Sequence, residues 1–153
     1  MIEFTIPGRG EYRLRHLALD LNGTLALDGS LIDGVAERLD ALRERLKIHV
    51  LTADTFDAAT AIERVLGFAT VRIRGTEEKT TYVERLGRAS VAAIGNGAND
   101  AGMLAVAALG IGVLGLEGLA CEALEASDVV APDILVALDL LLKHKRLVTT
   151  LRS

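Results

Sequence analysis

The stretch from Leu17 to Thr24 limits the fold of this chain more than any other part. It reads Leu-Ala-Leu-Asp-Leu-Asn-Gly-Thr, an apolar run that ends in a carboxylate and continues into a glycine turn. A buried strand of this kind carries Asp20 to its carboxyl end, and Gly23 lets the chain turn sharply there. Open α/β sheets place their ligands at that edge. Asp20 is therefore a candidate nucleophile, and a residue that only caps a turn is the alternative.

Apolar runs and helical repeats alternate along the rest of the chain. After the first strand, apolar residues recur at steps of three and four from 32 to 46, which predicts a helix. Further strands are predicted at 48–51, 70–74, 91–94, 110–113 and 129–131, and further helices at about 56–66, 77–86, 100–108, 119–126 and from 134. This alternation predicts an α/β fold, a Rossmann-like doubly wound parallel sheet in three α/β/α layers, with residues 1–153 as a single domain.

Two short segments stand outside this alternation. Residues 1–15 alternate around Pro7-Gly8 and predict an N-terminal β-hairpin, which we expect at a sheet edge. Residues 25–29 form a short flap after the first strand, with Asp28-Gly29 as its turn.

The composition narrows the class of protein. Half of the residues are hydrophobic but only 3% are aromatic, so Leu, Val, Ile and Ala must build the core, as in sheets covered on both faces. The net charge is −4, and no block of Lys or Arg suggests a nucleic-acid partner.

We expect a cytoplasmic protein without a membrane partner. The longest uncharged stretch, residues 101–116, is interrupted by glycines and is shorter than the roughly 18 to 20 apolar residues of a membrane helix. The N-terminus lacks the basic start and apolar run of a signal peptide. The single Cys121 excludes an internal disulfide and fits a reducing compartment.

Three further motifs follow predicted strands or begin predicted helices. They are Leu51-Thr-Ala-Asp54, Glu78-Lys79, and Gly95-Asn-Gly-Ala-Asn-Asp100. Because ligands of open α/β sheets bind where the strand order reverses, we expect Asp20, Thr52, Lys79 and the segment 96–100 to converge at one edge.

The ordered motifs resemble the haloacid dehalogenase superfamily over nearly the whole chain. Within it, Leu51-Thr-Ala-Asp54, the helix from Lys79, the loop from Asn96 to Ala101 and the later runs 110–115 and 126–130 are most similar to the phosphorylation domain of P-type ATPases. The gaps between the motifs are too short for the cap domain that many members insert.

The resemblance implies a role for each motif residue. Asp20 would attack a phosphoryl group and form an aspartyl-phosphate. Thr52 would donate its hydroxyl to a phosphoryl oxygen, and Lys79 would neutralise charge in the transition state. The alternatives are a helix cap for Thr52 and a solvated surface charge for Lys79.

The same resemblance implies a magnesium ion, because a phosphate approaching a carboxylate nucleophile requires a hard cation held by oxygens. Asp20 and the backbone carbonyl of Asn22 would be ligands, with Asn96 and Asp100 completing the shell directly or through water. The segment 96–100 can also be a turn before a helix that Asn99 or Asp100 caps.

Two positions depart from the family pattern. Asn22 stands where superfamily phosphatases carry the general acid, and Asn96 stands where an acidic metal ligand is usual. General acid catalysis contributes about 10² to 10⁴ in rate, so we expect slow hydrolysis, fastest for leaving groups that need no proton. The alternatives are a weakened phosphate-binding or regulatory protein and, from another class, a non-phosphate reaction such as dehalogenation.

The expected partner is a small-molecule phosphate substrate. Since an uncapped site leaves an aspartyl-phosphate open to water, and some capless relatives close the site with a neighbouring subunit, we also expect a homo-oligomer.

Overall fold

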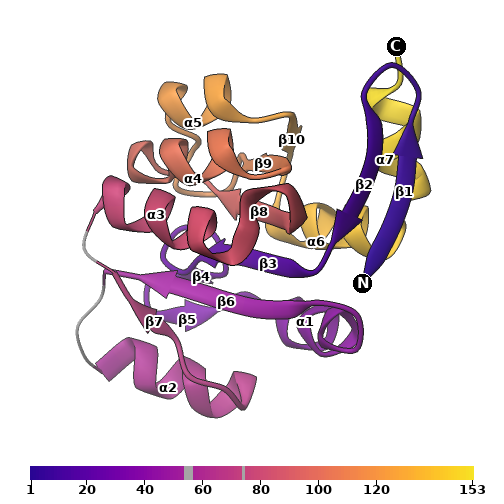
Figure 1. Cartoon of the computed structure of the whole chain (residues 1–153). Coiled ribbons are helices and arrows are strands. Elements are labelled where there is room, and N and C mark those ends of the chain that lie inside the picture. The colour runs from indigo at the N-terminus through magenta and orange to yellow at the C-terminus, as the bar shows by residue number, and fades with distance from the viewer. Residues whose placement is uncertain (54–56, 74) are drawn as a thin grey trace.

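A six-stranded parallel sheet forms the centre of the molecule. The structure, a computed structural model, describes residues 1–53, 57–73 and 75–153. The strand order is β10-β9-β8-β3-β6-β7, with every neighbouring pair parallel. The strands are β3 His16–Asp20, β6 Lys47–Thr52, β7 Val71–Arg72, β8 Val91–Gly95, β9 Leu109–Val113 and β10 Val129–Ala131. The first strand of this sheet, β3, lies in the middle, and the later strands extend to both edges, which confirms the predicted doubly wound α/β fold (Figure 1).

Helices cover both faces of the sheet (Figure 1). One face carries α3, α4 and α5, and the other carries α1 and α6, with α2 on the same side near the β7 edge. The bounds are α1 Val35–Arg43, α2 Asp57–Leu66, α3 Thr76–Gly87, α4 Ala101–Val106, α5 Cys121–Ala126 and α6 Ile134–Leu142, with short 3₁₀ turns η1 Arg88–Ser90 and η2 Ala98–Asp100.

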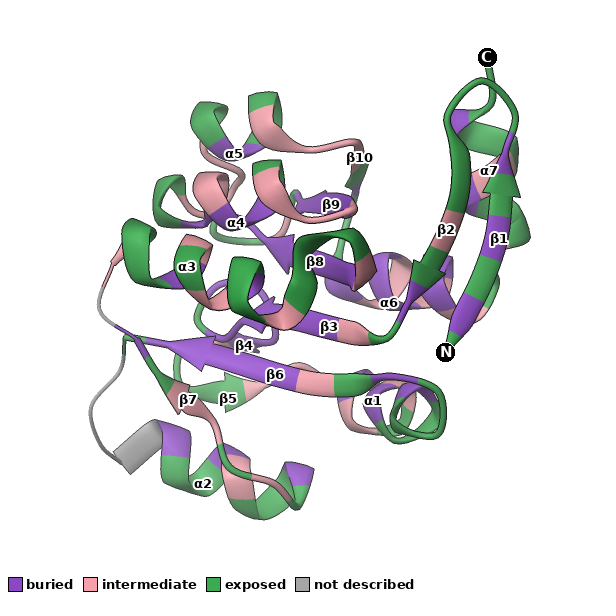
Figure 2. Cartoon of the chain, viewed as in Figure 1, coloured by how far each residue is buried: buried purple, intermediate pink, exposed green. Residues whose placement is uncertain are grey.

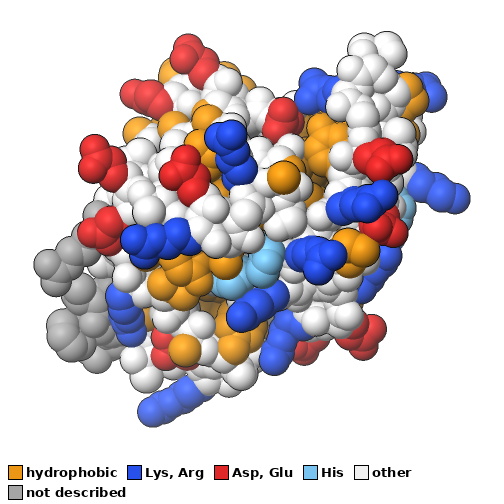
Figure 3. Space-filling view, in the orientation of Figure 1, with side chains coloured by type: hydrophobic (Ala, Val, Ile, Leu, Met, Phe, Trp, Pro, Cys, Tyr) orange, Lys and Arg blue, Asp and Glu red, His pale blue; other side chains and the backbone are white. Residues whose placement is uncertain are grey.

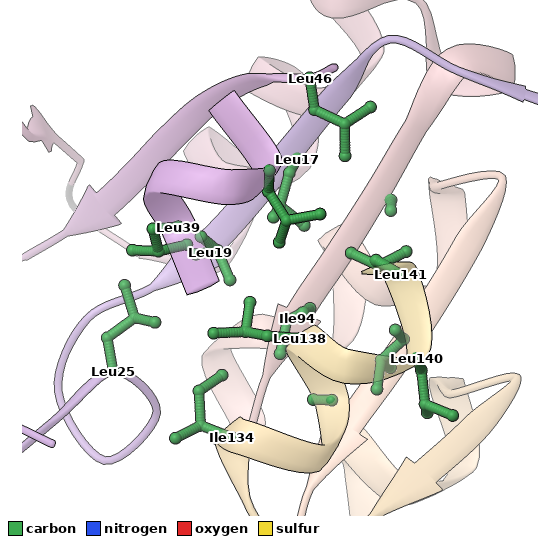
Figure 4. Packing of buried hydrophobic residues seen from close by; sticks show 14 of the residues in the cluster. Leu17, Leu19, Leu25, Leu39, Leu46, Ile94, Ile134, Leu138, Leu140 and Leu141 are labelled. Carbon is green, nitrogen blue, oxygen red and sulfur yellow. The ribbon is translucent and has the colours of Figure 1, made fainter. Parts of the chain in front are cut away.

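The period of two along each strand divides the core into two layers. In β3, Leu17 and Leu19 pack with α1 and α6, whereas Ala18 faces α3 and α4. Figure 4 shows the first layer, in which Leu17, Leu19 and Ile94 meet the leucines of α1 and α6. Both sides of the central strands are therefore apolar, and Figure 2 shows them buried while the outer faces of the helices are exposed.

The N-terminal hairpin lies apart from the main sheet. Strand β1 (Ile2–Ile6) pairs antiparallel with β2 (Gly10–Leu14), and the two form a separate sheet. The expectation that this hairpin lies at a sheet edge is wrong, because β1 packs on a last helix, α7 (Lys145–Leu151) (Figure 1). The predicted final helix is thus two helices, and α7 uses Leu147 and Leu151 to join the hairpin to the core.

A tight hairpin lies between β3 and α1 in the sequence. Strands β4 (Ala26–Leu27) and β5 (Ser30–Leu31) are joined by Asp28 and Gly29, whose φ angles of 50° and 81° are those of a type I′ turn. Among the described residues, this hairpin is the secondary structure that lies between β3 and α1. Asp54 and the predicted helix start near residue 56 lie outside the described residues.

Two histidines have structural partners far from the Asp20 end of the sheet. His16 Nδ1 and His49 Nε2 are 3.1 Å apart, and His49 Nδ1 lies 2.9 Å from the Tyr82 hydroxyl. Burial, together with the charges of His16 and Lys47, lowers the pKa of His49 to about 4. In Figure 3 histidine side chains show at the surface among Lys and Arg, with both signs of charge interspersed over this face.

A membrane-spanning helix has about 20 mainly apolar residues. Across residues 1–53, 57–73 and 75–153, none of the helices reaches the length and apolar character needed to cross a membrane.

Candidate active site

The predicted site residues meet at the carboxyl edge of the sheet, around the end of its central strand. Asp20 ends β3, Thr52 ends the neighbouring β6, and Asn96 directly follows β8 on the other side. Lys79 reaches them from α3, which covers one face. All four side chains are buried, as strand ends beneath a helix layer must be. From β3 the chain continues to β6 on one side and later to β8 on the other, so the strand order reverses here. Ligands usually bind at this position in such folds.

The ammonium of Lys79 lies between two carboxylates. Its Nζ is 2.7 Å from Asp20 Oδ1 and 2.7 Å from Asp100 Oδ1. Lys79 is 1% exposed and Asp100 is fully buried. A buried charge is tolerated only when it is paired and hydrogen-bonded. The alternative of a solvated surface lysine therefore does not describe Lys79.

This cluster sets the protonation of its members. Burial, and then the negative charge of Asp100, raises the pKa of Asp20 to about 6, although Lys79 counteracts both. Burial alone would lower the pKa of Lys79, but the charges and hydrogen bonds of Asp20 and Asp100 outweigh it and raise that pKa. Lys79 stays an ammonium, and one cation is shared by two carboxylates.

Asp100 uses both of its oxygens within the protein. Oδ1 accepts from Lys79, while Oδ2 accepts from the backbone N–H groups of Asn96 at 3.1 Å and Gly97 at 2.9 Å. A Cβ on Gly95 would lie 2.6 Å from the Asp100 carboxyl carbon, so only glycine leaves room for this side chain. Asp100 thus holds Lys79 and the loop after β8 in place, and a direct metal bond would have to displace these contacts.

Thr24 joins the site although the sequence interpretation assigned it no role. Its hydroxyl lies 3.1 Å from Asn96 Oδ1 and 3.4 Å from Asp20 Oδ2. Thr24 is 1% exposed. Its position in the motif after Asp20 was the available signal, and the turn at Gly23, with φ of 78°, brings it back over the strand end.

Asn22 lies at the open mouth of the site. Its side chain is exposed, and the turn is closed by the hydrogen bond from Gly23 N to Ala26 O at 2.8 Å. Thr52 is buried at the end of β6, where its carbonyl accepts from Ile73 N at 2.9 Å. The roles assigned to Asn22 and Thr52 from the resemblance stay predictions.

The donor atoms at this edge suit a hard cation. Asp20 Oδ2, Asn96 Oδ1 and the Thr24 hydroxyl are neighbouring oxygens, and no softer donor accompanies them in this group. Magnesium prefers such oxygen ligands and retains waters of its own. The residues present therefore fit magnesium, and the ligand roles of Asp20 and Asn96 stay predictions.

An apolar pocket adjoins the turn that follows β3. Its volume is about 340 Å³, and it shares Gly23 and Thr24 with the site. Leu27 of the flap, Leu116 of the loop after β9 and Leu135 of α6 line it with other mainly apolar residues. Leu116 is 88% exposed and adds apolar surface beside the site.

Two curated proteins are similar to this chain in sequence. No protein-family model matches it. One uncharacterised protein of Methanocaldococcus jannaschii is 56% identical over 39 residues, which are 26% of this chain and 89% of that protein. A second protein of the same organism is 50% identical over 63 residues, which are 41% of this chain and 68% of that protein.

Solved structures share the whole architecture. A zinc-transporting PIB-type ATPase in its E2.Pi state matches with a TM-score of 0.66 and 28% identity over 79% of this chain. This chain spans 20% of that ATPase. The chain has the fold of the haloacid dehalogenase superfamily, and its structural neighbours include phosphatases of that superfamily and a P-type ATPase. The predicted resemblance to the phosphorylation domain of P-type ATPases is thereby confirmed.

Phosphatases of this superfamily have the same fold. The 3-deoxy-D-manno-octulosonate 8-phosphate phosphatase of Moraxella catarrhalis, solved with magnesium, phosphate and KDO, has a TM-score of 0.68 at 18% identity. That match covers 91% of this chain and 94% of the phosphatase. A phospho-aspartyl intermediate analogue of phosphoserine phosphatase has a TM-score of 0.68 at 14% identity, with 86% of this chain and 99% of that chain covered.

The shared lysine predicts that Asp20→Asn stabilises the metal-free protein at pH 8. Because the folded pKa of Asp20 is about 6 and the ordinary value is 3.8, the folded state holds this proton more tightly. Stability is therefore lost as pH rises through this window, and the loss is complete above it. Removing the carboxylate should restore roughly 1 to 3 kcal/mol at pH 8 and less towards pH 4.

Urea unfolding with EDTA at several pH values measures this effect. Asp40→Asn, an exposed change of equal charge on α1, is the matched control. An Asp20→Asn protein that is less stable than this control at pH 8 would contradict the assigned electrostatics.

Proposed function

We propose that this protein is a magnesium-dependent phosphohydrolase that works through an aspartyl-phosphate on Asp20. The observation that carries the proposal is the buried Asp20–Lys79–Asp100 cluster at the carboxyl edge of the sheet. A carboxylate with its own cation at a ligand-binding edge is an arrangement suited to accept a phosphoryl group. The fold shared with phosphatases of the superfamily supports a hydrolase.

The proposed reaction has two steps. A carboxylate oxygen of Asp20 attacks phosphorus, and the bond from phosphorus to the leaving oxygen breaks with its electron pair on that oxygen. Water then attacks the phosphoaspartate, which releases inorganic phosphate and regenerates the carboxylate. Lys79 offsets charge at Asp20 in both steps, and Thr52 donates its hydroxyl to a phosphoryl oxygen.

A divalent cation would be held by Asp20, Asn96 and the Asn22 carbonyl. Bound there, it would withdraw negative charge from the phosphoryl oxygens. The superfamily phosphatases solved with magnesium or cobalt support a divalent metal of this kind. Asp100 supports this group from behind, through Lys79 and the N–H groups of Asn96 and Gly97.

The leaving group is the part of the substrate that the site constrains most. The exposed Asn22 side chain is an amide and cannot act as a general acid, so a leaving oxygen that is already a weak base loses least. The apolar pocket beside Gly23 suits an uncharged, apolar body. Aryl phosphates and acyl phosphates meet both conditions. The homo-oligomer and the cytoplasmic location stay predictions.

An aryl phosphate tests the proposed activity directly. We expect 4-nitrophenyl phosphate to be hydrolysed with magnesium present, and Asp20→Asn to abolish the turnover because no other group replaces the nucleophile. Asp40→Asn should leave the rate unchanged. If Asp20→Asn keeps the wild-type rate, the nucleophile is wrong. If the wild type binds phosphate and magnesium without turnover, the protein is the weakened phosphate-binding or regulatory member that its two asparagines also fit.

The missing acid predicts a gain of function. Asn22→Asp should raise hydrolysis of alkyl phosphates by about 10² to 10⁴-fold and should help aryl phosphates much less, since their leaving groups need no proton. Steady-state kcat/KM on matched alkyl and aryl esters measures the contrast.

Both site asparagines precede glycine, a sequence prone to deamidation. Mass spectrometry of the assayed sample must therefore show intact Asn22 and Asn96 in the wild type. Equal gains on alkyl and aryl esters, or none on either with magnesium binding intact, would contradict the role given to position 22.

A further inference from the structure

The proposed magnesium site is short of free carboxylate oxygens. Both oxygens of Asp100 are hydrogen-bonded within the protein, and Asp20 shares Oδ1 with Lys79. Position 22 and position 96 contribute amides. Asp20 Oδ2 is thus the one anionic oxygen of the predicted ligand set that its ion-pair partner leaves open. Magnesium sites in proteins usually combine one or two carboxylates with substrate phosphate and water, so a second carboxylate has a place here.

The loop after β9 brings another carboxylate to the same edge. This loop, residues 114–120, is fastened to Asn96 at two points: Asn96 Nδ2 donates to Gly118 O at 3.2 Å, and Ala120 N donates to Asn96 O at 2.9 Å. Within it, Gly118 N donates to Gly115 O at 3.0 Å and closes a turn. Glu117 lies inside this turn, so its backbone is held beside Asn96.

The Glu117 side chain extends over Gly23, in the turn that follows β3. A Cβ built on Gly23 would overlap Glu117 Oε2, and the same Cβ would lie 2.8 Å from Asn96 Nδ2. The Glu117 carboxylate and the Asn96 amide therefore approach one point above Gly23. The other end of that amide, Oδ1, belongs to the oxygen group of Thr24 and Asp20. Glycine at position 23 is what lets a carboxylate from another loop come this close.

We propose that Glu117 supplies the second carboxylate of the magnesium site and replaces the negative charge that Asn96 lacks. The inference rests on the proposed function for the presence of magnesium. Glu117 is exposed, so an ion can enter from solvent without opening the fold. Asn96, in the loop after β8, is uncharged, and Glu117, in the loop after β9, supplies the negative charge instead. The hydrogen bonds between Asn96 and Gly118 and Ala120 hold the two loops together.

Magnesium affinity, measured without substrate, tests this assignment. In calorimetric titrations of the full chain, Glu117→Gln should weaken magnesium binding at least about tenfold, because it removes a charged ligand and keeps the side-chain shape. Glu122→Gln, an equal charge change at an exposed site on α5, should have little effect. Asn96→Asp in the Glu117→Gln protein should recover the affinity, since it returns a carboxylate to the same ion.

Each result decides the assignment. Loss in Glu117→Gln with recovery by Asn96→Asp supports it. It is overturned if Glu117→Gln binds magnesium as well as Glu122→Gln does, if Asn96→Asp recovers nothing, or if the wild type binds no magnesium. A loss of turnover in Glu117→Gln at unchanged affinity also overturns it and would assign Glu117 to proton transfer. Failure of the proposed function appears separately, as Glu117-dependent magnesium binding without any turnover.

Discussion

The ammonium of Lys79 between Asp20 and Asp100 is the interaction on which the functional edge of this protein depends. It joins three parts of the chain that are far apart in sequence: the end of β3, the first turns of α3 and the loop after β8. The second oxygen of Asp100 extends the connection to the backbone of that loop. Since both carboxylates are buried, removing the cation would leave them side by side without their shared counter-ion, at a cost of several kcal/mol.

The same cluster leaves Asp20 with too little positive charge around it. Burial, and then the negative charge of Asp100, raises the pKa of Asp20 to about 6, and the single cation Lys79 only partly offsets both. A divalent cation would supply the missing positive charge. Bond formation between Asp20 and phosphorus would remove the negative charge of the carboxylate. Reduced stability without ligand and reactivity with ligand thus have one cause, as is common at active sites.

The strand ends of the site could be predicted from the sequence, whereas the contacts between loops could not. Asp20, Thr52 and Asn96 each follow an apolar run, and parallel strands bring their carboxyl ends to one edge. The role of Asp100 as the partner of Lys79 depends on a side chain turning back under Gly95, which no periodicity reveals. Glu117 belongs to no motif, and only the fastening of its loop to Asn96 brings it near. The N-terminal hairpin was placed wrongly, because the alternation of apolar and polar residues shows that its strands pair but not which surface they cover.

Chemical trapping of the intermediate shows whether Asp20 becomes phosphorylated. The protein would be treated with acetyl phosphate and magnesium, reduced with borohydride, and digested for mass spectrometry, because borohydride converts an acyl phosphate of aspartate to homoserine. We expect homoserine at position 20, dependent on magnesium and absent from Asp20→Asn. Homoserine at another aspartate, or none at position 20 in protein shown to bind magnesium, would contradict this expectation.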